Sequence, residues 1–429
     1  MNSNTSLYSK GLGKNAGRIV LHSDLNNFFA SVECSNSGDP TIYEKPVAVC
    51  GDREQRHGII LAKNEKAKLY EIKTGEPINS ALKKCPELLL FEAHYDLYMR
   101  YSRTARAIYR EFSDRVEPFG MDEAWIELTG CPGIHTIEDG KRVADLIRHR
   151  IKKELGITAS VGVSDNKSFA KLASDFKKPD ATTVLSPYEY EKTISPMQLS
   201  QILYVGKSSA KRLRSFGVCT VGQAAQKSPE FLRSILGKNG VSIHAVCNGE
   251  DISPVSRAGT QDPQKSIGNS TTPPKDITSL HETKLILYSL CETVCSRLRE
   301  QNKKCRAVKI SFRDTNLYSF ERQLQLGFLS SNSSEIMKKV YDLVKETINF
   351  DTTKLRSIGI CAIELSGCDT QDQTSLFYET STKVDTIDKT VDSLRKRFGY
   401  GILSNAFCLC DAEGIGKIER GYEVFTNLR

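Results

Sequence analysis

The hydrophobic positions of the chain alternate between the spacing of short strands and the spacing of amphipathic helices. An apolar run at residues 18–25 predicts a buried strand, and residues 26–33 follow it with a helical pattern. Residues 115–128 read as two short strands around Gly120-Met121, which predicts a β-hairpin. Helical patterns at 94–112 and 137–155 and a strand at 158–163 complete the central part. We therefore predict a mixed fold of α+β type over this region.

Strands and helices also alternate in the C-terminal third. Strand patterns lie near 265–268, 305–313, 318–326 and 358–364, and helical patterns lie at 279–302 and 334–347. This order predicts a small α+β domain with its helices on one face of the sheet, which leaves the other face open. A last helix is predicted at 384–398.

Length and composition narrow the class of protein. A chain of 429 residues is too long for one core and indicates several domains. The net charge of +8 favours a polyanionic partner. Residues 1–17 are polar and no apolar run reaches membrane length, so we expect no signal peptide, no membrane association and a cytoplasmic location. Thirteen scattered cysteines without a CxxC pair indicate reduced thiols.

Acidic residues lie at the ends of two predicted strands. Asp122 and Glu123 are adjacent at the tip of the hairpin, and Asp24 ends the strand at 18–25. Crowded carboxylates repel one another unless a cation lies between them, and a divalent metal is the usual solution. Neighbouring strand residues point to opposite faces, so Asp122 and Glu123 share a site only if the backbone is irregular there. The alternative is that both are solvated turn residues.

The sequence around these acids resembles a known family. Asp24-Leu-Asn-Asn-Phe-Phe-Ala-Ser-Val-Glu33 and Met121-Asp-Glu-Ala124 resemble the paired catalytic motifs of Y-family DNA polymerases, closest to the bacterial DNA polymerase IV (DinB) branch. The resemblance runs from about residue 18 to residue 366. It implies a multidomain α+β fold, with a right-handed polymerase palm (18–27 and 93–184), fingers (28–92), a thumb with a helix-hairpin-helix (185–252), a linker (253–262), an additional little finger domain (263–366) and a tail (367–429).

The resemblance also implies an activity. It is a template-directed DNA polymerase of the translesion type, which adds deoxynucleotides from dNTPs to a primer 3′-hydroxyl with low fidelity and without proofreading. Such phosphoryl transfer uses two cations, for which Mg²⁺ is expected and Mn²⁺ is the other candidate. By the resemblance, Asp24 and Asp122 ligate the metals with the Leu25 carbonyl, and Glu123 completes the site of the metal that activates the hydroxyl.

Other residues match the family's nucleotide-binding positions. Phe29 matches the steric gate, an aromatic ring that leaves no room for a ribose 2′-hydroxyl, while Phe28 reads as core. Among the lysines near the helix start at 63–70, the resemblance favours Lys68 for the phosphates, and Lys171 matches the lysine that holds the β- and γ-phosphates. Two positions depart from the family: Asn26 replaces a second acid that is not a usual ligand, and Glu65 replaces a tyrosine that contacts phosphate.

Several positions are expected to contact primer–template DNA. The sequence 204–222 resembles a helix-hairpin-helix, in which Gly206 and Lys207 begin a helix whose amides face a phosphate, although Tyr204 replaces a frequent glycine. Residues 263–366 hold 16 Lys and Arg against 11 Asp and Glu, so the open face of that sheet is expected to lie on DNA. The candidates there are Lys265, Arg306, Lys309, Arg313 and Arg322.

The tail contains Gln373-Thr-Ser-Leu-Phe377, which resembles the peptide that binds the β sliding clamp through Gln373, Leu376 and Phe377. We expect a monomer that binds DNA, dNTPs and the clamp. Two alternatives remain open from sequence. One is a clamp-tethered DNA-binding protein with impaired synthesis, suggested by Glu65, and the other is a two-metal nuclease, which accounts less well for Phe29.

Overall fold

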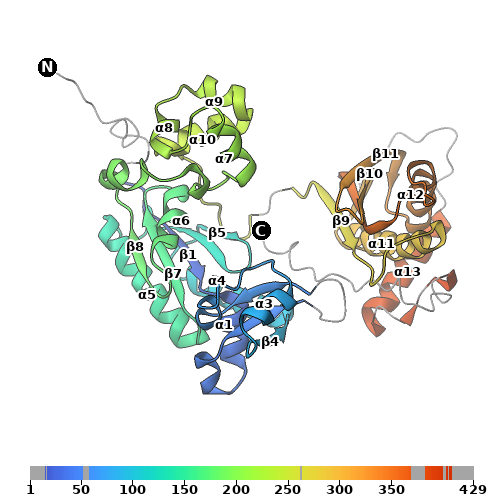
Figure 1. Ribbon diagram of the computed structural model, residues 1–429, viewed down its shortest axis with the longest axis horizontal. Helices are drawn as coiled ribbons and strands as arrows, with labels where there is room; N and C mark the ends of the chain where they lie inside the picture. Colours follow the sequence, from blue (N-terminus) through green and yellow to red (C-terminus); the bar gives the residue numbers. More distant parts are fainter. Residues whose placement is uncertain are drawn as a thin grey trace. The chain divides into compact units, whose positions relative to one another are not determined.

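The computed structural model describes residues 15, 17–51, 58–260, 263–368, 382–399, 402–403 and 405–407. The chain divides near residue 261 into two compact units (Figure 1). Among the described residues, no helix combines the length and the hydrophobicity needed to cross a membrane.

A five-stranded sheet of order β5-β6-β1-β7-β8 forms the centre of the first unit. β1 lies between β6 and β7 and is antiparallel to both, β5 and β6 form the predicted hairpin, and β8 is parallel to β7. The strands are β1 (Val20–Leu25), β5 (Val116–Phe119), β6 (Glu123–Glu127), β7 (Ala159–Ser164) and β8 (Thr182–Val184).

The two faces of this sheet carry different residues because side chains alternate along each strand. Leu21 and Leu25 of β1 belong to the large core beneath α4 (Tyr95–Arg110) and α5 (Ile137–Leu155). Val20 packs instead with Trp125 and with α6 (Lys167–Phe176) on the other face. Asp24 shares the parity of Val20, so its side chain leaves β1 on the α6 side.

A second, three-stranded sheet of order β3-β2-β4 follows β1 in the sequence. Its strands are β2 (Val47–Cys50), β3 (Ile60–Lys63) and β4 (Leu89–Glu92), with helices α1 (Phe28–Asn36), η2 (Pro40–Glu44), α2 (Glu65–Lys68) and α3 (Ile78–Lys84). The predicted helix at 63–70 is shorter than expected, because Lys63 still belongs to β3 and Asn64 caps α2 through the Ala67 amide.

Short helices complete the first unit around a separate apolar core that includes Leu213, Val221 and Leu232. They are η3 (Pro187–Glu189), the π-helix η4 (Tyr190–Ile194), η5 (Leu199–Gln201), α7 (Lys207–Arg214), α8 (Val221–Ala225), α9 (Pro229–Leu236) and α10 (Lys238–Cys247). Thr220 and Ser228 cap α8 and α9, which explains why those helices begin where they do.

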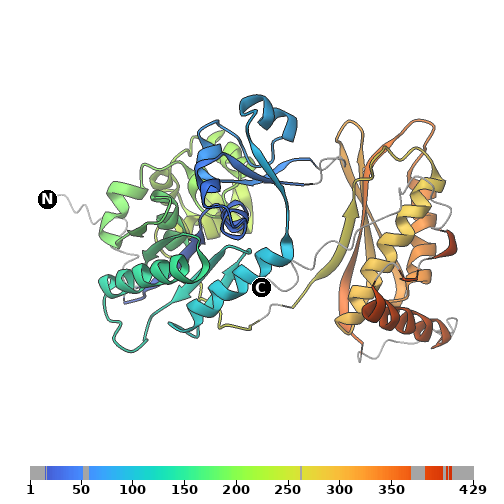
Figure 2. The ribbon, with the colours of Figure 1, turned by 90° about the horizontal axis from the view of Figure 1, so that it is seen from below.

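The second unit is an antiparallel sheet of order β11-β10-β12-β9, and Figure 2 shows its helices on one side of that sheet. Its elements are β9 (Ser266–Thr271), α11 (Leu280–Glu300), β10 (Lys303–Asp314), β11 (Ser319–Ser330), α12 (Ser333–Thr347), β12 (Leu355–Gly367) and α13 (Thr382–Phe398). Cys291 and Cys295 of α11 are buried in its core, as packing residues. The mixed α and β architecture agrees with the predicted fold class.

Candidate active site

A cavity of about 300 Å³ opens at the end of β1. It brings together elements that are far apart in sequence: the end of β1, the start of α1, β3, the tip of the β5–β6 hairpin and the segment after α6. Its lining comprises Asp24, Leu25, Asn27, Phe28, Phe29, Leu61, Ala62, Lys63, Thr74, Asp122 and Lys178. Of the predicted site residues, Asp24, Leu25, Phe29 and Asp122 therefore share one cavity.

The predicted metal ligands Asp24 and Asp122 lie in the same cavity because a backbone hydrogen bond joins the end of β1 to the hairpin tip. The Leu25 amide donates to the Asp122 carbonyl at 3.0 Å. Burial and the nearby charges of Asp24 and Glu123 raise the pKa of Asp122 to about 7. Burial also raises the pKa of Asp24, in spite of the opposing effect of Lys178. The pair thus carries the like-charge repulsion that a divalent cation relieves.

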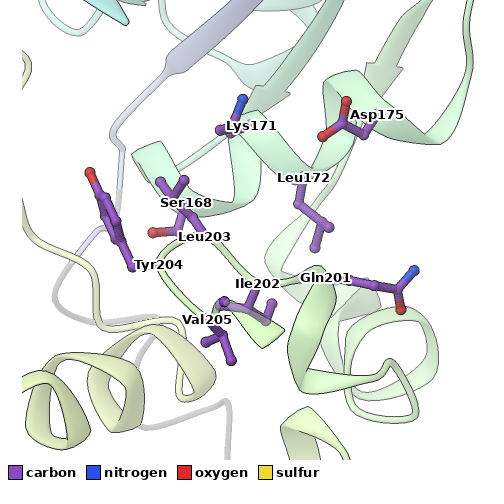
Figure 3. A pocket seen from close by; sticks show the side chains of 10 residues that line it. Ser168, Lys171, Leu172, Asp175, Gln201, Ile202, Leu203, Tyr204 and Val205 are labelled. Carbon is purple, nitrogen blue, oxygen red and sulfur yellow. The ribbon is translucent and has the colours of Figure 1, made fainter. Parts of the chain in front are cut away.

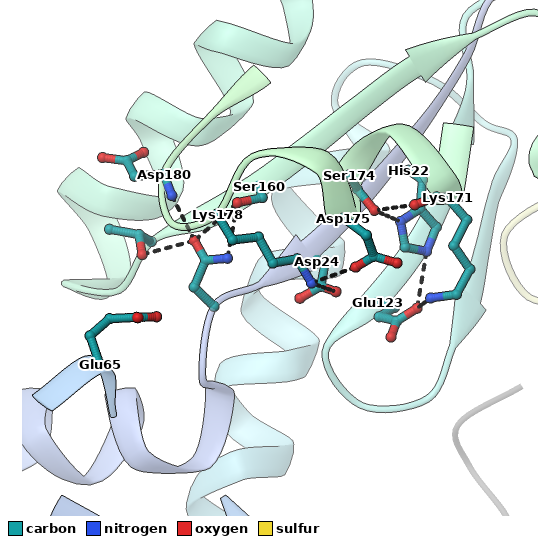
Figure 4. A network of polar contacts seen from close by, with 12 residues as sticks. His22, Asp24, Glu65, Glu123, Ser160, Lys171, Ser174, Asp175, Lys178 and Asp180 are labelled. Carbon is teal, nitrogen blue, oxygen red and sulfur yellow. Dashed lines mark hydrogen bonds and ion pairs between the residues drawn. The ribbon is translucent and has the colours of Figure 1, made fainter. Parts of the chain in front are cut away.

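Glu123 does not line this cavity, and its carboxylate is bound by side chains of α6 and β1 (Figure 4). It lies opposite Asp24 in the β1–β6 register, on the α6 side of the sheet. Its carboxylate accepts a hydrogen bond from Lys171 of α6 and lies 3.1 Å from His22 Nε2. Burial favours the neutral acid, but His22 and Lys171 hold the pKa of Glu123 at about 2. Glu123 is therefore ionised, and its charge is balanced by Lys171 of α6.

The three acids converge on one end of the sheet, but they do not form a ready-made cluster. Within the part of the chain that the structure describes, no three His, Cys, Asp or Glu side chains are grouped to hold a metal. The reason is local: Glu123 is turned toward Lys171, and Asp24 toward Lys178. The oxygens of Asp24, Asp122 and the adjacent Leu25 carbonyl nevertheless fit a hard divalent cation, which prefers such ligands.

Lys178 is a residue that sequence reasoning missed. Its Nζ lies 2.7 Å from Asp24 and 2.8 Å from Asp175 in Figure 4. These two carboxylates raise the pKa of Lys178 although burial lowers it. Its place directly before Pro179, just after α6, was the sequence signal that could have indicated it. Lys178 and Lys63 are the two ammonium groups in the cavity lining, so each can meet an anionic group bound there.

Asn26 has a structural role at the end of β1. Its side-chain NH₂ group donates to the Ser160 hydroxyl of β7 at 3.0 Å. Its side-chain oxygen Oδ1 accepts from the Asp180 backbone amide at 2.9 Å and from the Thr158 hydroxyl at 3.1 Å. The side chain is 3% exposed. Asn26 thus fixes the segment after Lys178 against the end of β1.

Phe29 lines the cavity and is supported from behind by tyrosines of α4. Its ring stacks on Tyr98 with centroids 4.3 Å apart and meets the edge of Tyr95 at 5.9 Å. Tyr98 is fully buried and donates to Glu33 at 2.5 Å. The α4 tyrosines are thus packing residues, and they hold the Phe29 ring in place. Phe28 is only 3% exposed and belongs to the core.

Glu65 occupies the position where the family pattern has a tyrosine, and its carboxylate is already bonded. It accepts from Asn27 at 2.8 Å and from Lys68 at 2.7 Å. Burial disfavours its ionisation, but these two hydrogen bonds lower the pKa of Glu65. Lys68, predicted to hold phosphate, is thus paired with Glu65, and Lys63 rather than Lys68 lines the cavity.

Lys171 borders a second cavity of about 370 Å³ between α6 and residues 201–206 (Figure 3). In Figure 3 its side chain lies beside Ser168 and above the segment that carries Tyr204. Lys167, one turn earlier on α6, pairs with Glu117 at 2.7 Å and lies over the Trp125 ring. Lys167 therefore anchors α6 to the sheet.

The predicted helix-hairpin-helix consists of α7 and α8. Gly206 is the N-cap of α7 without a side-chain cap, and Lys207 is its first residue. Tyr204 adopts the left-handed conformation that favours glycine, with φ of 68°, and its side chain is 71% exposed. A non-glycine residue pays about 1–2 kcal/mol for this conformation.

We expect Tyr204→Gly to raise the free energy of unfolding by about 0.5–1 kcal/mol, because the relief of strain exceeds the extra entropy of a glycine. Urea unfolding of the purified chain measures this change. Tyr204→Ala is the control, since it removes the ring and keeps the strain. A glycine variant less stable than the alanine variant would contradict the assignment of strain.

The DNA-contact candidates of the second unit fall on different sides of its sheet. Lys309 and Arg313 of β10 alternate with Val308, Ile310 and Phe312, which pack in the core under the helices. They therefore lie on the open face, although Lys309 is paired with Glu321 at 3.1 Å. Arg306 and Lys265 are exposed near the start of β10 and before β9.

Arg322 does not fit the expected open face. The register pairs it with Ile310, and partners in adjacent strands share a face. Its guanidinium lies 5.5 Å from the Phe320 ring, and Phe320 packs against the core under the helices. Arg322 therefore leaves edge strand β11 on the helix side. The expectation was wrong because the sequence alone does not determine the register of β11. The clamp candidates Gln373, Leu376 and Phe377 lie outside the described residues.

Comparisons with known proteins identify the family of this chain. Residues 23–175 match the impB/mucB/samB family, and residues 264–376 match its C-terminal domain. A protein of Acetivibrio thermocellus named DNA polymerase IV is 43% identical over 403 residues, which are 94% of this chain and 100% of the relative. A DNA polymerase IV of Clostridium acetobutylicum is 32% identical over 91% of this chain and 98% of its own length.

A solved Y-family DNA polymerase chimera of Dbh and Dpo4 has a similar fold, with a TM-score of 0.69. It is 23% identical and covers 81% of this chain and 98% of its own. The family match, the relatives and the shared fold together show a DNA-directed DNA polymerase of the Y-family type. The chain belongs to the impB/mucB/samB family, in the branch whose bacterial members are called DNA polymerase IV.

Proposed function

We propose that this chain is a template-directed translesion DNA polymerase that adds deoxynucleotides from dNTPs to a primer 3′-hydroxyl. Low fidelity, damage bypass and the lack of proofreading belong to the proposal. The observation that carries it is the meeting of Asp24 and Asp122 in one cavity with Phe29. Two carboxylates of separate elements serve metal-assisted phosphoryl transfer, and the aromatic ring beside them serves the choice of sugar.

The proposed metal ligands are Asp24, Asp122 and the Leu25 carbonyl, with Glu123 joining once it leaves Lys171. Two Mg²⁺ ions held by these residues would make the primer hydroxyl more acidic and neutralise charge on the triphosphate. Mn²⁺ is the other candidate, since it prefers the same oxygen ligands.

In this proposal, the lysines that pair with Glu123 and Asp24 also bind the triphosphate. Lys171 is paired with Glu123, and Lys178 with Asp24. An ammonium that loses its carboxylate next to a bound triphosphate gains phosphate oxygens instead. We therefore assign Lys171 and Lys178 to the phosphates, together with Lys63 in the cavity lining, and we assign Phe29 to exclusion of the 2′-hydroxyl.

The remaining contacts concern DNA and the clamp. We propose that Gly206 and Lys207 bind a backbone phosphate of primer–template DNA, and that Lys265, Arg306, Lys309 and Arg313 bind it across the second unit. Gln373, Leu376 and Phe377 are proposed to bind the β sliding clamp. The proposal also includes a monomeric state and a cytoplasmic location.

Primer extension by the purified full-length chain tests the proposal. We expect Mg²⁺-dependent extension of a labelled primer on an undamaged template and past a single abasic site. Labelled DNA without dNTPs is the control, and it should stay intact. Degradation in that control would favour the nuclease, and a lack of extension with either metal would defeat the polymerase.

A second candidate is a clamp-tethered primer–template-binding protein with impaired synthesis. It is favoured by the ion pair between Glu65 and Lys68, since a carboxylate near a triphosphate is repulsive and occupies a phosphate-binding lysine. The two candidates differ in how the chain binds dNTPs.

Glu65→Tyr separates them. The substitution removes the negative charge, frees Lys68 and restores a hydroxyl donor. Together these changes should improve the free energy of dNTP binding by about 1–2 kcal/mol, so we expect KM for dNTP to fall about tenfold. Steady-state primer extension measures it. Glu44→Gln is the matched control, because it breaks the exposed Lys66–Glu44 pair outside the cavity lining. An unchanged KM with efficient wild-type extension would reject the impaired candidate.

A further inference from the structure

Glu33 is a buried carboxylate that takes no part in the proposed reaction. It lies on α1, one helical turn after Phe29, so the two side chains leave the same face of the helix. Its side chain is 5% exposed and does not border the cavity at the end of β1. A buried carboxylate destabilises the folded state unless polar groups compensate it. The groups that bind Glu33 therefore indicate its role.

The first turn of α4 binds Glu33. Its Oε1 accepts a hydrogen bond from the Tyr98 hydroxyl at 2.5 Å and lies 3.0 Å from His94 Nδ1. The His94 side chain is 61% exposed, so water can replace that contact, whereas Tyr98 has no exposed surface. Burial and the Glu33 carboxylate raise the pKa of the Tyr98 hydroxyl, which therefore stays protonated and donates. Loss of Glu33 would leave this buried donor without its acceptor.

Tyr98 connects Glu33 to the ring that lines the cavity. Its ring stacks on Phe29 with centroids 4.3 Å apart and an interplanar angle of 11°. One tyrosine thus contacts two residues of α1 that are one turn apart, Phe29 through its face and Glu33 through its hydroxyl. The hydrogen bond at the hydroxyl end opposes displacement of the Tyr98 ring, and Phe29 can move back from the cavity only if that ring moves.

Exclusion of a 2′-hydroxyl by Phe29 requires that the ring cannot retreat. A ribonucleotide differs from a deoxynucleotide by a single oxygen atom, so a small movement of the ring is enough to admit it. Side chains packed closely behind a ring prevent that movement, because they leave no empty space for it. The support behind Phe29 is therefore as important for the choice of sugar as the ring itself.

We propose that Glu33 is a positioning residue for the choice of sugar: it holds Tyr98, and Tyr98 keeps the Phe29 ring forward in the cavity. This inference rests on the proposed function, namely exclusion of the 2′-hydroxyl by Phe29. Glu33 itself touches neither the nucleotide nor the metals in this scheme. Without its carboxylate, the Tyr98 hydroxyl shifts toward another acceptor, and the Phe29 ring loses its support.

Single-nucleotide extension with matched rNTP and dNTP by the purified full-length chain tests the inference. We expect Glu33→Ala to raise the incorporation of rNTP relative to dNTP about tenfold. Glu33→Gln keeps a side-chain oxygen acceptor at the same distance from the backbone, so it should restore the wild-type ratio to within about twofold. Tyr98→Phe keeps the stacked ring and removes only the hydroxyl, and it should raise the ratio as Glu33→Ala does.

Tyr190→Phe is the matched control. Tyr190 donates to the buried carboxylate of Asp165 at 2.5 Å, and its ring lies 4.3 Å from that of Phe169. The variant therefore removes the same kind of hydrogen bond, but away from the cavity lining. It should lose stability as Tyr98→Phe does and keep the wild-type ratio of rNTP to dNTP. Urea unfolding of each variant measures the stability, which separates general loosening from a change at Phe29.

A double variant shows whether Glu33 acts through Phe29. Once Phe29 is alanine, Glu33→Ala should not change the ratio further, because the ring that it positions is gone. Should Glu33→Ala fail to fold, Tyr98→Phe replaces it in both backgrounds.

The outcomes are distinguishable. An unchanged ratio in Glu33→Ala and Tyr98→Phe, an equal rise in Tyr190→Phe, or additive effects in the double variant would each overturn the role of Glu33 and leave the polymerase proposal intact. A wild type that extends primers and a Phe29→Ala variant with an unchanged ratio would overturn the role of Phe29, and that of Glu33 with it. A wild type that fails to extend primers would overturn the proposed function itself, together with this inference.

Discussion

Asp122→Asn is expected to abolish primer extension and, at the same time, to stabilise the metal-free protein. Loss of a metal ligand removes several kcal/mol of transition-state stabilisation, which corresponds to a fall in kcat on the order of 10³-fold or more. Gel analysis of extended primers under saturating dNTP measures this fall. Asp114→Asn is the matched control, because Asp114 is an exposed acid of the same unit.

The effect on stability has the opposite sign and follows from the raised pKa of Asp122. The pKa is about 7 in the folded chain and roughly 3.9 when unfolded. Protonation therefore favours the folded state, and stability is lost as the pH rises from about 4 to about 7. The asparagine variant avoids this loss, so we expect a gain of about 1–3 kcal/mol in the free energy of unfolding at pH 7.5.

Urea unfolding at several pH values without metal measures this gain, which should vanish near pH 4. Added Mg²⁺ should stabilise the wild type more than the variant, because ligand binding to the folded state shifts the equilibrium. A variant that keeps extending primers, or one that is less stable than the wild type at pH 7.5, would contradict the assignment of Asp122.

Phe29→Ala is expected to admit ribonucleotides. The ring fills space at the cavity, and its removal should raise the incorporation of rNTP relative to dNTP on the order of 10²-fold, since a steric contact of this size is worth about 2–3 kcal/mol. Single-nucleotide extension with matched rNTP and dNTP measures the ratio. The variant should also lose stability, because Phe29 stacks on Tyr98.

Phe28→Leu separates the two effects. Phe28 is a buried neighbour in the same helix turn, and its ring lies 5.7 Å from that of Phe29. Its substitution should lower stability without changing the choice of sugar. Equal changes in the ratio for both variants would show that loosening of α1, and not removal of a gate, admits the ribonucleotide.

Much of the fold could be predicted because its signals are local. The apolar run of β1, the Gly120 turn and the stripes of α4 and α5 each reflect the period of one element, and neighbouring residues alone determine it. The resemblance in 24–33 and 121–124 indicated the family that the comparisons show. The boundaries of palm, fingers, thumb and little finger stay predictions, as do the roles of the site residues.

The candidate site was predictable only in part, because contacts between distant residues depend on packing. The motifs indicated Asp24, Asp122 and Phe29, which do share a cavity. No pattern indicated that Lys178 would pair with Asp24 or that Glu123 would turn to Lys171. These pairings arise where α6 crosses the sheet, and the crossing depends on the whole core of the unit.

The sequence by itself determined which elements form, which family the chain resembles and which residue types its site contains. Only the tertiary structure decided which partner each charged group has: Glu65 with Lys68, Arg322 on the helix side of its sheet, and Asp388 and Asp392 with Arg299. The physical reason is the range of the forces involved. Backbone periodicity acts between neighbours, whereas an ion pair forms between any two groups that folding brings within a few ångströms.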